Sequence, residues 1–255
     1  MGENSKIEWT THTFNPWIGC TKVSPGCDGC YAENLMAIRY KRVEWGAGED
    51  RARTSPANWR KPLQWEKEAR ITGRRPFVFC ASLADVFDNE VEEKWRDELF
   101  RLIEATPSLI WLLLTKRVGN VRKMTDPERG CRFLPRNAAI GATMVNQEEY
   151  DRDRMKLHDL KYQREPLFTF GSFEPLIGPV ILDKYAPDWI IVGGETDQGS
   201  HKARFTDVTW MRGLRDQSAM LNRSFFLKQM TNKAVIPPDL QVRHWPIDRT
   251  TYAAA

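Results

Sequence analysis

Three cysteines lie close together near the start of the chain, at Cys20, Cys27 and Cys30, with the spacing C-x6-C-x2-C. Pro25 and Gly29 lie between them, and such residues let the backbone fold back so that the three thiols face one point. Three thiolates on one loop suit an iron–sulfur cluster or a zinc ion. A site with only three protein ligands leaves one metal position open for a small ligand.

A second arrangement of the same thiols stays open. His12 lies eight residues before Cys20 and could complete a closed Cys3His zinc site. Cys80 and Cys131 are isolated, and we assign neither of them to the metal. The odd number of cysteines and the crowding of three on one loop argue against a disulfide framework, so we expect a reducing cytoplasm.

The bulk composition permits an enzyme. The chain has 255 residues, of which 41% are hydrophobic and 28% charged, and this fits one domain over 1–255 with a C-terminal extension from about 230 to 255. Residues 1–13 carry no apolar segment typical of a signal peptide. The longest apolar run, 109–114, is too short to span a bilayer, so we expect no membrane partner.

The basic residues are unevenly distributed. Residues 51–75 hold eight Lys and Arg against two acidic residues, and residues 116–136 hold seven against two. The first stretch also contains Trp59 and Trp65, with Trp45 just before it. Basic residues interleaved with aromatic rings suit a polyanion with bases that can stack. Taken alone, the tryptophans are more typical of core residues.

Short apolar runs recur along the chain, each followed by polar residues or Gly. They occupy 77–80, 109–114, 138–141, 167–170, 189–192 and 224–227, and we expect a further first strand over Phe14–Gly19. Runs that are nearly continuous in hydrophobicity are typical of buried parallel strands.

Helical patterns separate these runs. The clearest covers Asp88–Ala105, where apolar residues recur on one face, and Asn89 with Glu92 three residues later predicts its N-terminal cap. Three further helices are expected over 33–42, 147–160 and 207–221. This alternation predicts an α/β fold with a parallel sheet, either open or closed as a (β/α) barrel.

Polar residues follow the predicted strands at the point where each one ends. In such folds the carboxyl ends of the strands meet around one cavity, where function collects. We therefore expect a shared active site there, formed by strand-end residues that include Ser82, Asp85, Lys116, Glu174, Glu195 and Lys228.

The same segments resemble a known family. The run from Asn15 to Glu33, which holds the three cysteines, is similar to the three-cysteine-motif proteins of phages and prophages. Further family signatures are found at 82–87, 114–117, 173–176, 192–195, 226–229 and 240–246. The family is similar to radical SAM enzymes, with spore photoproduct lyase among its nearer relatives.

The resemblance implies a partial or complete, TIM-barrel-like (β/α) barrel of radical SAM type. Cys20, Cys27 and Cys30 would bind three irons of a [4Fe-4S] cluster, and S-adenosyl-L-methionine would bind the fourth. An electron from a donor such as flavodoxin or ferredoxin would cleave this ligand. The resulting 5′-deoxyadenosyl radical would abstract a hydrogen atom from the substrate.

The resemblance also assigns roles to the strand-end residues. Ser82 and Asp85 would lie near the amino group of S-adenosyl-L-methionine, and Lys116 near its carboxylate. Closer to the substrate, the catalytic positions would be Glu174, Glu195 and Lys228.

The chain departs from the family pattern in two places. The gap between Cys20 and Cys27 is longer than the three residues usual in radical SAM enzymes. Phe205 follows Arg204 where the family has proline.

The sequence names no substrate. The phage association and the basic stretches favour a DNA base or modified nucleoside, acted on in base modification, rearrangement or repair in the host cytoplasm. The alternative is a non-catalytic, zinc-stabilised nucleic-acid-binding protein.

Overall fold

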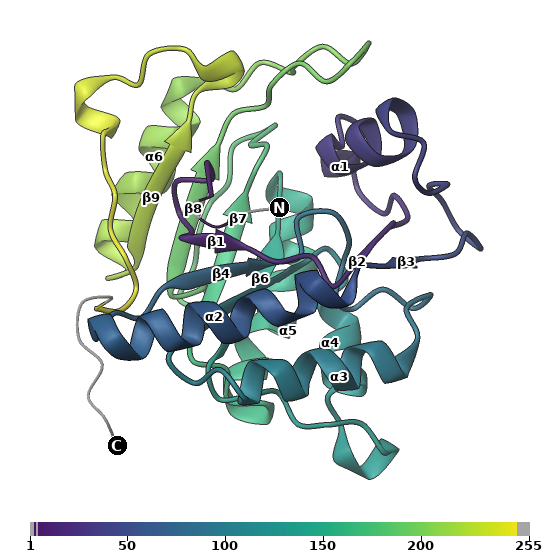
Figure 1. Cartoon of the computed structure of the whole chain (residues 1–255). Coiled ribbons are helices and arrows are strands. Elements are labelled where there is room, and N and C mark those ends of the chain that lie inside the picture. Colours follow the sequence, from purple (N-terminus) through teal and green to yellow (C-terminus); the bar gives the residue numbers. More distant parts are fainter. Residues whose placement is uncertain (1–2, 4, 249–255) are drawn as a thin grey trace.

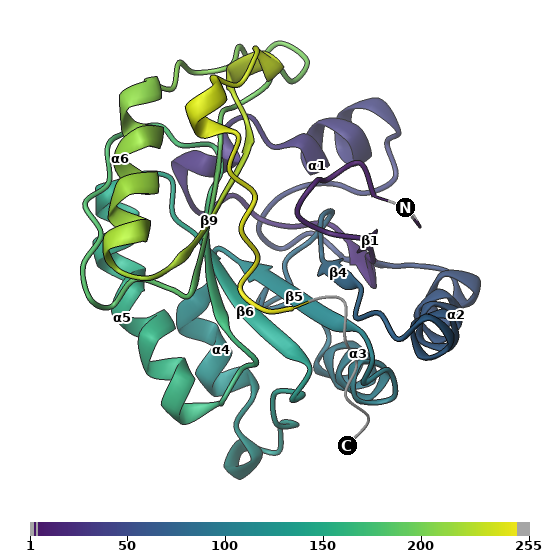
Figure 2. The same cartoon turned by 90° about the vertical axis from the view of Figure 1, so that its left-hand side faces the viewer.

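A parallel β-sheet forms the centre of the molecule. The computed structural model describes residues 3 and 5–248. Its seven-stranded sheet has the order β1-β4-β5-β6-β7-β8-β9, and all neighbouring strands are parallel. The strands are β1 His12–Thr13, β4 Phe77–Cys80, β5 Ile110–Thr115, β6 Ala138–Thr143, β7 Thr169–Phe173, β8 Trp189–Gly193 and β9 Ser224–Gln229. The sheet curls but stays open between β1 and β9, so the fold is a partial (β/α) barrel, here called the half-barrel (Figures 1 and 2).

Helices follow the strands and cover the outer side of the half-barrel. They are α2 Pro56–Thr72, α3 Glu93–Glu104, α4 Val118–Met124, α5 Gln147–Gln163 and α6 Val208–Met220. Figure 2 shows them arranged around the convex side, from α2 on the right to α6 on the left. None of the helices in the described part of the chain has both the length and the apolar character needed to cross a bilayer.

Side chains alternate between the two faces of the sheet, as the period of a β-strand requires. In β4, Val78 and Cys80 face the helices, whereas Phe77 and Phe79 face the inside of the half-barrel. The inside at the amino ends of the strands is filled by aromatic rings, here called the aromatic floor; its members are Trp9, Phe77, Phe79, Phe168, Phe170, Trp189, Phe226 and Trp245.

Gly141 of β6 is required by this packing. A Cβ atom at position 141 would lie 2.2 Å from the ring of Phe170, so only glycine leaves room for that ring. The carboxyl half of the inside surface is therefore left to smaller and polar side chains.

The prediction of a first strand over Phe14–Gly19 is wrong. The strand that joins the main sheet is β1, which ends before Phe14. Trp17–Ile18 instead forms β2, paired antiparallel with β3 Ala52–Arg53 in a separate two-stranded sheet. Pro16 lies at this break, and proline cannot donate a hydrogen bond within a sheet.

The other predicted strands agree with β4 to β9 to within a few residues. The helix expected over Asp88–Ala105 begins later, at Glu93, and Asn89 is not its cap. Asp88 is buried and receives hydrogen bonds from Arg51 on its side chain and from Arg96 on its carbonyl, and these contacts hold the chain in a turn before the helix.

The helix expected over 33–42 is short and irregular, consisting of α1 Tyr31–Glu33 and a π-helical turn over Asn34–Arg39. The sequence reasoning missed α2 altogether, although Ser55 caps it, Pro56 begins it and the left-handed Gly73 ends it.

The described part of the C-terminal extension runs back along β9. The Leu227 amide donates to the carbonyl of Val242 (3.1 Å), and the His244 amide donates to that of Phe225 (2.9 Å). Trp245 packs against Trp189 of the aromatic floor, with ring centroids 5.5 Å apart. Residues 242–245, here called the C-terminal strap, therefore pack against the core and cover the edge of β9. Positions 249–255 of the predicted extension lie outside the described residues.

Candidate active site at the carboxyl ends of the strands

The three cysteines of the sequence motif line one cavity. It has a volume of about 140 Å³ and opens at the carboxyl ends of β4, β5 and β6; we call it the cysteine cavity. Cys20 follows β2, Cys27 ends a 3-10 turn, and Cys30 immediately precedes α1 (Figure 1). The Ser24 hydroxyl accepts a hydrogen bond from the Gly26 amide (3.0 Å) and fixes the turn between the thiols. All five cysteines of the chain are free thiols.

The cysteines share a cavity, but they do not form a preformed site for a single ion. Among residues 3 and 5–248, no group of three or more His, Cys, Asp or Glu side chains is arranged to hold one metal ion. A zinc ion needs its sulfur ligands at about 2.3 Å. His12, the residue considered for a Cys3His site, does not line the cavity; its ring stacks on Trp65 at 4.3 Å. Burial lowers the pKa of His12.

Ser82, Asp85 and Lys116 line the same cavity, so the structure brings the predicted S-adenosyl-L-methionine contacts together with the three cysteines. Ser82 follows β4, where its hydroxyl accepts a hydrogen bond from the side chain of Asn15 (3.0 Å). Asn15 also accepts from the Leu83 amide (2.7 Å). Asn15 is fully buried, so it fixes the turn that carries Ser82.

Asp85 is buried, and its carboxylate is fully engaged. It accepts hydrogen bonds from the Thr115 hydroxyl (2.7 Å) and from the amides of Phe87 (2.9 Å) and Lys116 (3.1 Å). It also pairs with Arg117 at 3.2 Å. Asp85 therefore joins the turn after β4 to the end of β5.

Lys116 presents a positive charge to the cavity. Its ammonium donates to the Thr143 hydroxyl at 3.4 Å, and within the described residues no carboxylate lies within ion-pair distance of it. An unpaired ammonium in a sheltered cavity can bind the carboxylate of a ligand strongly.

Arg117 is a site residue that the sequence reasoning did not single out. Its guanidinium donates to the sulfur of Cys20 (3.4 Å) and to the carbonyl of Thr21 (2.9 Å) while it pairs with Asp85. Burial and the negative charge of Asp85 raise the pKa of the Cys20 thiol to about 11, against the opposing effect of Arg117. Arg117 could have been found from its position shortly after the strand that ends at Thr115. Its contact with Cys20 and Thr21, almost a hundred residues earlier, leaves no signal in the sequence.

Glu195 follows β8 and lies against residues 20–30, here called the cysteine loop; it does not line the cysteine cavity. Both of its oxygens accept from the Arg204 guanidinium, at 2.7 and 2.9 Å, and one lies 3.2 Å from Nε2 of His201. Burial raises the pKa of Glu195, but the hydrogen bonds from Arg204 outweigh it, and the net pKa is lowered. Arg204 and His201 are further contact residues that the sequence reasoning did not assign.

Glu174 and Lys228 form an ion pair. The Lys228 ammonium lies 2.7 Å from a Glu174 oxygen, and the Ser172 hydroxyl donates to the other oxygen at 3.3 Å. The structure thus brings these two predicted catalytic residues together from the end of β7 and from β9, whereas Glu195 pairs with Arg204.

Lys228 also lines a separate cavity of about 220 Å³, here called the seam cavity. Lys6 and Glu8 line it from the segment before β1, and Lys233 lines it from the segment after β9. It lies between the two edge strands, where the half-barrel is open. Glu8 pairs with Arg243 (2.8 Å), so its carboxylate does not neutralise the lysines that line the cavity.

Many charges of the two basic stretches are already paired within the fold. Buried Arg51 pairs with Asp88, Arg117 with Asp85, and Arg132 with Glu104. Arg53 pairs with Glu98 and lies over the ring of Trp59. The basic stretches therefore offer less free charge to a polyanion than their composition indicates.

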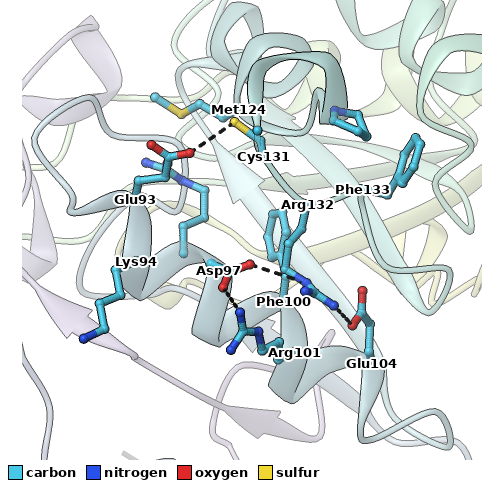
Figure 3. A pocket seen from close by; sticks show the side chains of 13 residues that line it. Glu93, Lys94, Asp97, Phe100, Arg101, Glu104, Met124, Cys131, Arg132 and Phe133 are labelled. Carbon is cyan, nitrogen blue, oxygen red and sulfur yellow. Dashed lines mark hydrogen bonds and ion pairs between the residues drawn. The ribbon is translucent and has the colours of Figure 1, made fainter.

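The two isolated cysteines lie elsewhere. Cys80 is fully buried on the helix side of β4, where burial raises its pKa. Cys131 lines a cavity of about 680 Å³ beside α3, and its thiol donates to Glu93 at 3.5 Å (Figure 3). Arg132 and Arg101 in this cavity are both paired with acidic side chains, as Figure 3 shows.

A family model described as a protein of unknown function, DUF5131, matches residues 4–241. The chain belongs to this family. No curated protein and no solved structure matches this DUF5131 chain. Its function must therefore be argued from the site.

Proposed function

We propose that this DUF5131 protein is a radical SAM enzyme. The observation that carries the proposal is the cysteine cavity: Cys20, Cys27 and Cys30 line it together with Ser82, Asp85 and Lys116, at the carboxyl ends of the strands of a partial (β/α) barrel. Three thiols and one unpaired ammonium provide ligands for a metal cluster and for an anionic group beside it.

The donor set suits a [4Fe-4S] cluster. A cluster places iron and sulfide atoms between its ligands, so its cysteines stand farther apart than those around one ion. Cys20, Cys27 and Cys30 line one cavity, and their thiols are ligands of the kind that such a cluster takes. Cys20, Cys27 and Cys30 would hold the cluster. With S-adenosyl-L-methionine bound, the reduced cluster would supply the electron that cleaves this ligand, and so the radical chemistry that removes a hydrogen atom from the substrate.

The chain's own residues bind and orient the ligand. The Lys116 ammonium would bind its carboxylate, and the turn at Ser82, fixed by Asn15, would face its amino group. Asp85 acts mainly through Arg117 and Thr115, which it holds in place. The cysteine loop lies over the ends of the strands and limits the access of water.

The proposed substrate carries phosphate, as a nucleotide or a DNA strand does. In the seam cavity, Lys6 and Lys233 pair with no carboxylate among the described residues, and Lys228 connects this cavity to Glu174. Ammonium groups gathered at the open side of the half-barrel favour an anionic substrate. The reaction also needs an electron donor such as flavodoxin or ferredoxin.

Anaerobic purification tests the proposal. We expect a brown protein that contains iron and sulfide, and that forms 5′-deoxyadenosine when it is given dithionite and S-adenosyl-L-methionine. Cys27→Ser should abolish iron binding, while Cys131→Ser, the matched control outside the cavity, should leave it unchanged. A colourless zinc protein, or a protein that holds iron and never cleaves S-adenosyl-L-methionine, would overturn the proposal.

A further inference from the structure

The cysteine loop is held at its two ends by arginines from the segments that follow two different strands, β5 and β8. At the first end, Arg117 follows β5 and contacts the sulfur of Cys20 and the carbonyl of Thr21. At the second end, the Arg204 guanidinium donates to the carbonyl of Pro25 (3.0 Å) and to the carboxylate of Asp28 (3.1 Å). The two arginines thus hold both ends of the loop at the carboxyl ends of the strands, here called the mouth of the half-barrel.

Arg204 is itself fixed. Its guanidinium donates to both oxygens of Glu195, at 2.7 and 2.9 Å, and its backbone amide donates to the same carboxylate at 2.9 Å. The Glu195 side chain is only 6% exposed, and one residue, Gly194, separates it from the end of β8. Glu195 and Arg204 therefore hold the loop at a fixed position relative to the sheet.

Close packing confirms that the loop is seated on this contact. A Cβ atom at Gly29 would lie 2.5 Å from the ring of His201 and 2.7 Å from Glu195, so the backbone of the loop approaches Glu195 as closely as a glycine allows. Only two residues lie between Cys27 and Cys30, and Asp28 and Gly29 both touch the pair formed by Glu195 and Arg204.

We propose that Glu195 and Arg204 are positioning residues that form a clasp on the Cys27–Cys30 end of the loop, while Arg117 holds the Cys20 end. The clasp sets the separation between Cys20 and the other two thiols across the long six-residue gap. The claim that the clasp serves cluster binding rests on the proposed function, but the claim that it holds the loop does not. Glu195 is accordingly a positioning residue instead of a catalytic one.

The test is alkylation of the metal-free protein with iodoacetamide, read residue by residue by mass spectrometry. Arg204→Gln should raise the alkylation rate of Cys27 by about tenfold, because the loop opens locally, and leave Cys20 unchanged. Arg117→Gln should leave Cys27 at its wild-type rate, because it removes no contact at that end of the loop. Arg204→Lys should restore only part of the protection, because an ammonium cannot reproduce the fork that joins Glu195 to the loop. Cys131, outside the loop, serves as the internal reference.

Two further variants control the test. Arg212→Gln removes an arginine that pairs with Asp239 on the surface, and it should change no cysteine rate. Gly29→Ala removes no charge but displaces the loop from Glu195, and it should expose Cys27 as Arg204→Gln does. Circular dichroism establishes that each variant is folded.

The outcomes separate the clasp from the proposed function. Equal Cys27 rates in wild type and in folded Arg204→Gln would overturn the clasp, even if the wild type binds iron. Selective exposure of Cys27 supports the clasp, and it does so even in a protein that never binds a cluster. In a wild type that binds iron, Arg204→Gln should lower the iron bound per chain and alter its visible spectrum; an unchanged spectrum would overturn the role of the clasp in setting cluster geometry.

Discussion

The two halves of the inner surface of the half-barrel differ sharply, although the same strands build both. At the amino ends, Phe77 and Trp189 belong to the aromatic floor, where aromatic rings pack against one another. At the carboxyl ends, Glu174 follows β7 and Glu195 follows β8, only a few residues beyond the floor. A strand can therefore contribute stability with its first residues and chemistry with its last.

The comparison also shows how each half is held together. The floor depends on apolar burial, which contributes about 25 cal/mol for each Å² removed from water. The mouth depends on buried charges that neutralise one another, such as Asp85 with Arg117 and Glu195 with Arg204. Loss of one partner leaves a buried charge without compensation, so a single polar substitution in the mouth should be destabilising. The floor is sensitive for a different reason, which is the loss of buried apolar area.

The largest effect on stability is expected in the floor. Trp189 is fully buried, contacts several other rings, and donates through its indole nitrogen to the carbonyl of His244 (3.0 Å). Trp189→Ala should lower the free energy of unfolding by about 3–5 kcal/mol, measured by urea denaturation. Cys27 should keep its wild-type protection in the folded fraction. Exposure of Cys27 in that fraction would show that floor and mouth are not separable.

A smaller effect is expected at the mouth. Asp85→Asn keeps the size of the side chain but removes the charge that compensates Arg117, and it should lower the free energy of unfolding by about 2–3 kcal/mol. The same change should raise the alkylation rate of Cys20, because Arg117 loses its fixed position. Urea denaturation and mass spectrometry measure the two effects. Wild-type stability together with a protected Cys20 would contradict the role assigned to Asp85.

Lys116 should affect binding and leave stability unchanged. Its ammonium pairs with no carboxylate in the described structure, so Lys116→Gln should alter the free energy of unfolding by less than about 0.5 kcal/mol. The affinity of the iron-loaded protein for S-adenosyl-L-methionine, measured by calorimetry, should fall about tenfold. An unchanged affinity would remove Lys116 from the ligand site.

The smallest effect is expected at the seam cavity. Replacing Lys6 and Lys233 by Gln should weaken binding to single-stranded DNA and reduce the slope of log affinity against log salt by about 1.4. Lys202→Gln is the control, because Lys202 is an exposed lysine that already pairs with Asp197. Fluorescence anisotropy at several salt concentrations measures the slope. An identical slope in the variant and wild type would exclude this cavity as a phosphate site.

Much of the sheet was predictable from the sequence, because buried parallel strands are continuous apolar runs and leave a clear pattern. The first strand was not, since β1 is only two residues long and its pairing with β4 is decided by tertiary contacts. Helix α2 was missed because its apolar face is narrow: its buried positions include Asn58 and Glu66, and six of its 17 residues are charged.

The candidate site divides in the same way. The cysteines, Ser82, Asp85 and Lys116 were found from local motifs and the rule that strand ends meet. The partners of those residues were not found. Arg204 contacts Pro25 and Asp28 across more than 170 positions, and such a contact depends on the path of the loop, which no local pattern records.

The C-terminal strap has a practical consequence for handling the protein. An uncovered edge strand exposes unpaired amide and carbonyl groups to which another chain can add, which leads to aggregation. Because Val242 and His244 occupy the hydrogen-bonding groups of β9, a shortened chain that ends before position 240 would expose that edge together with the rings beneath Trp245. Expression trials should therefore retain the chain through Asp248, and a purification tag placed after it would leave the edge covered.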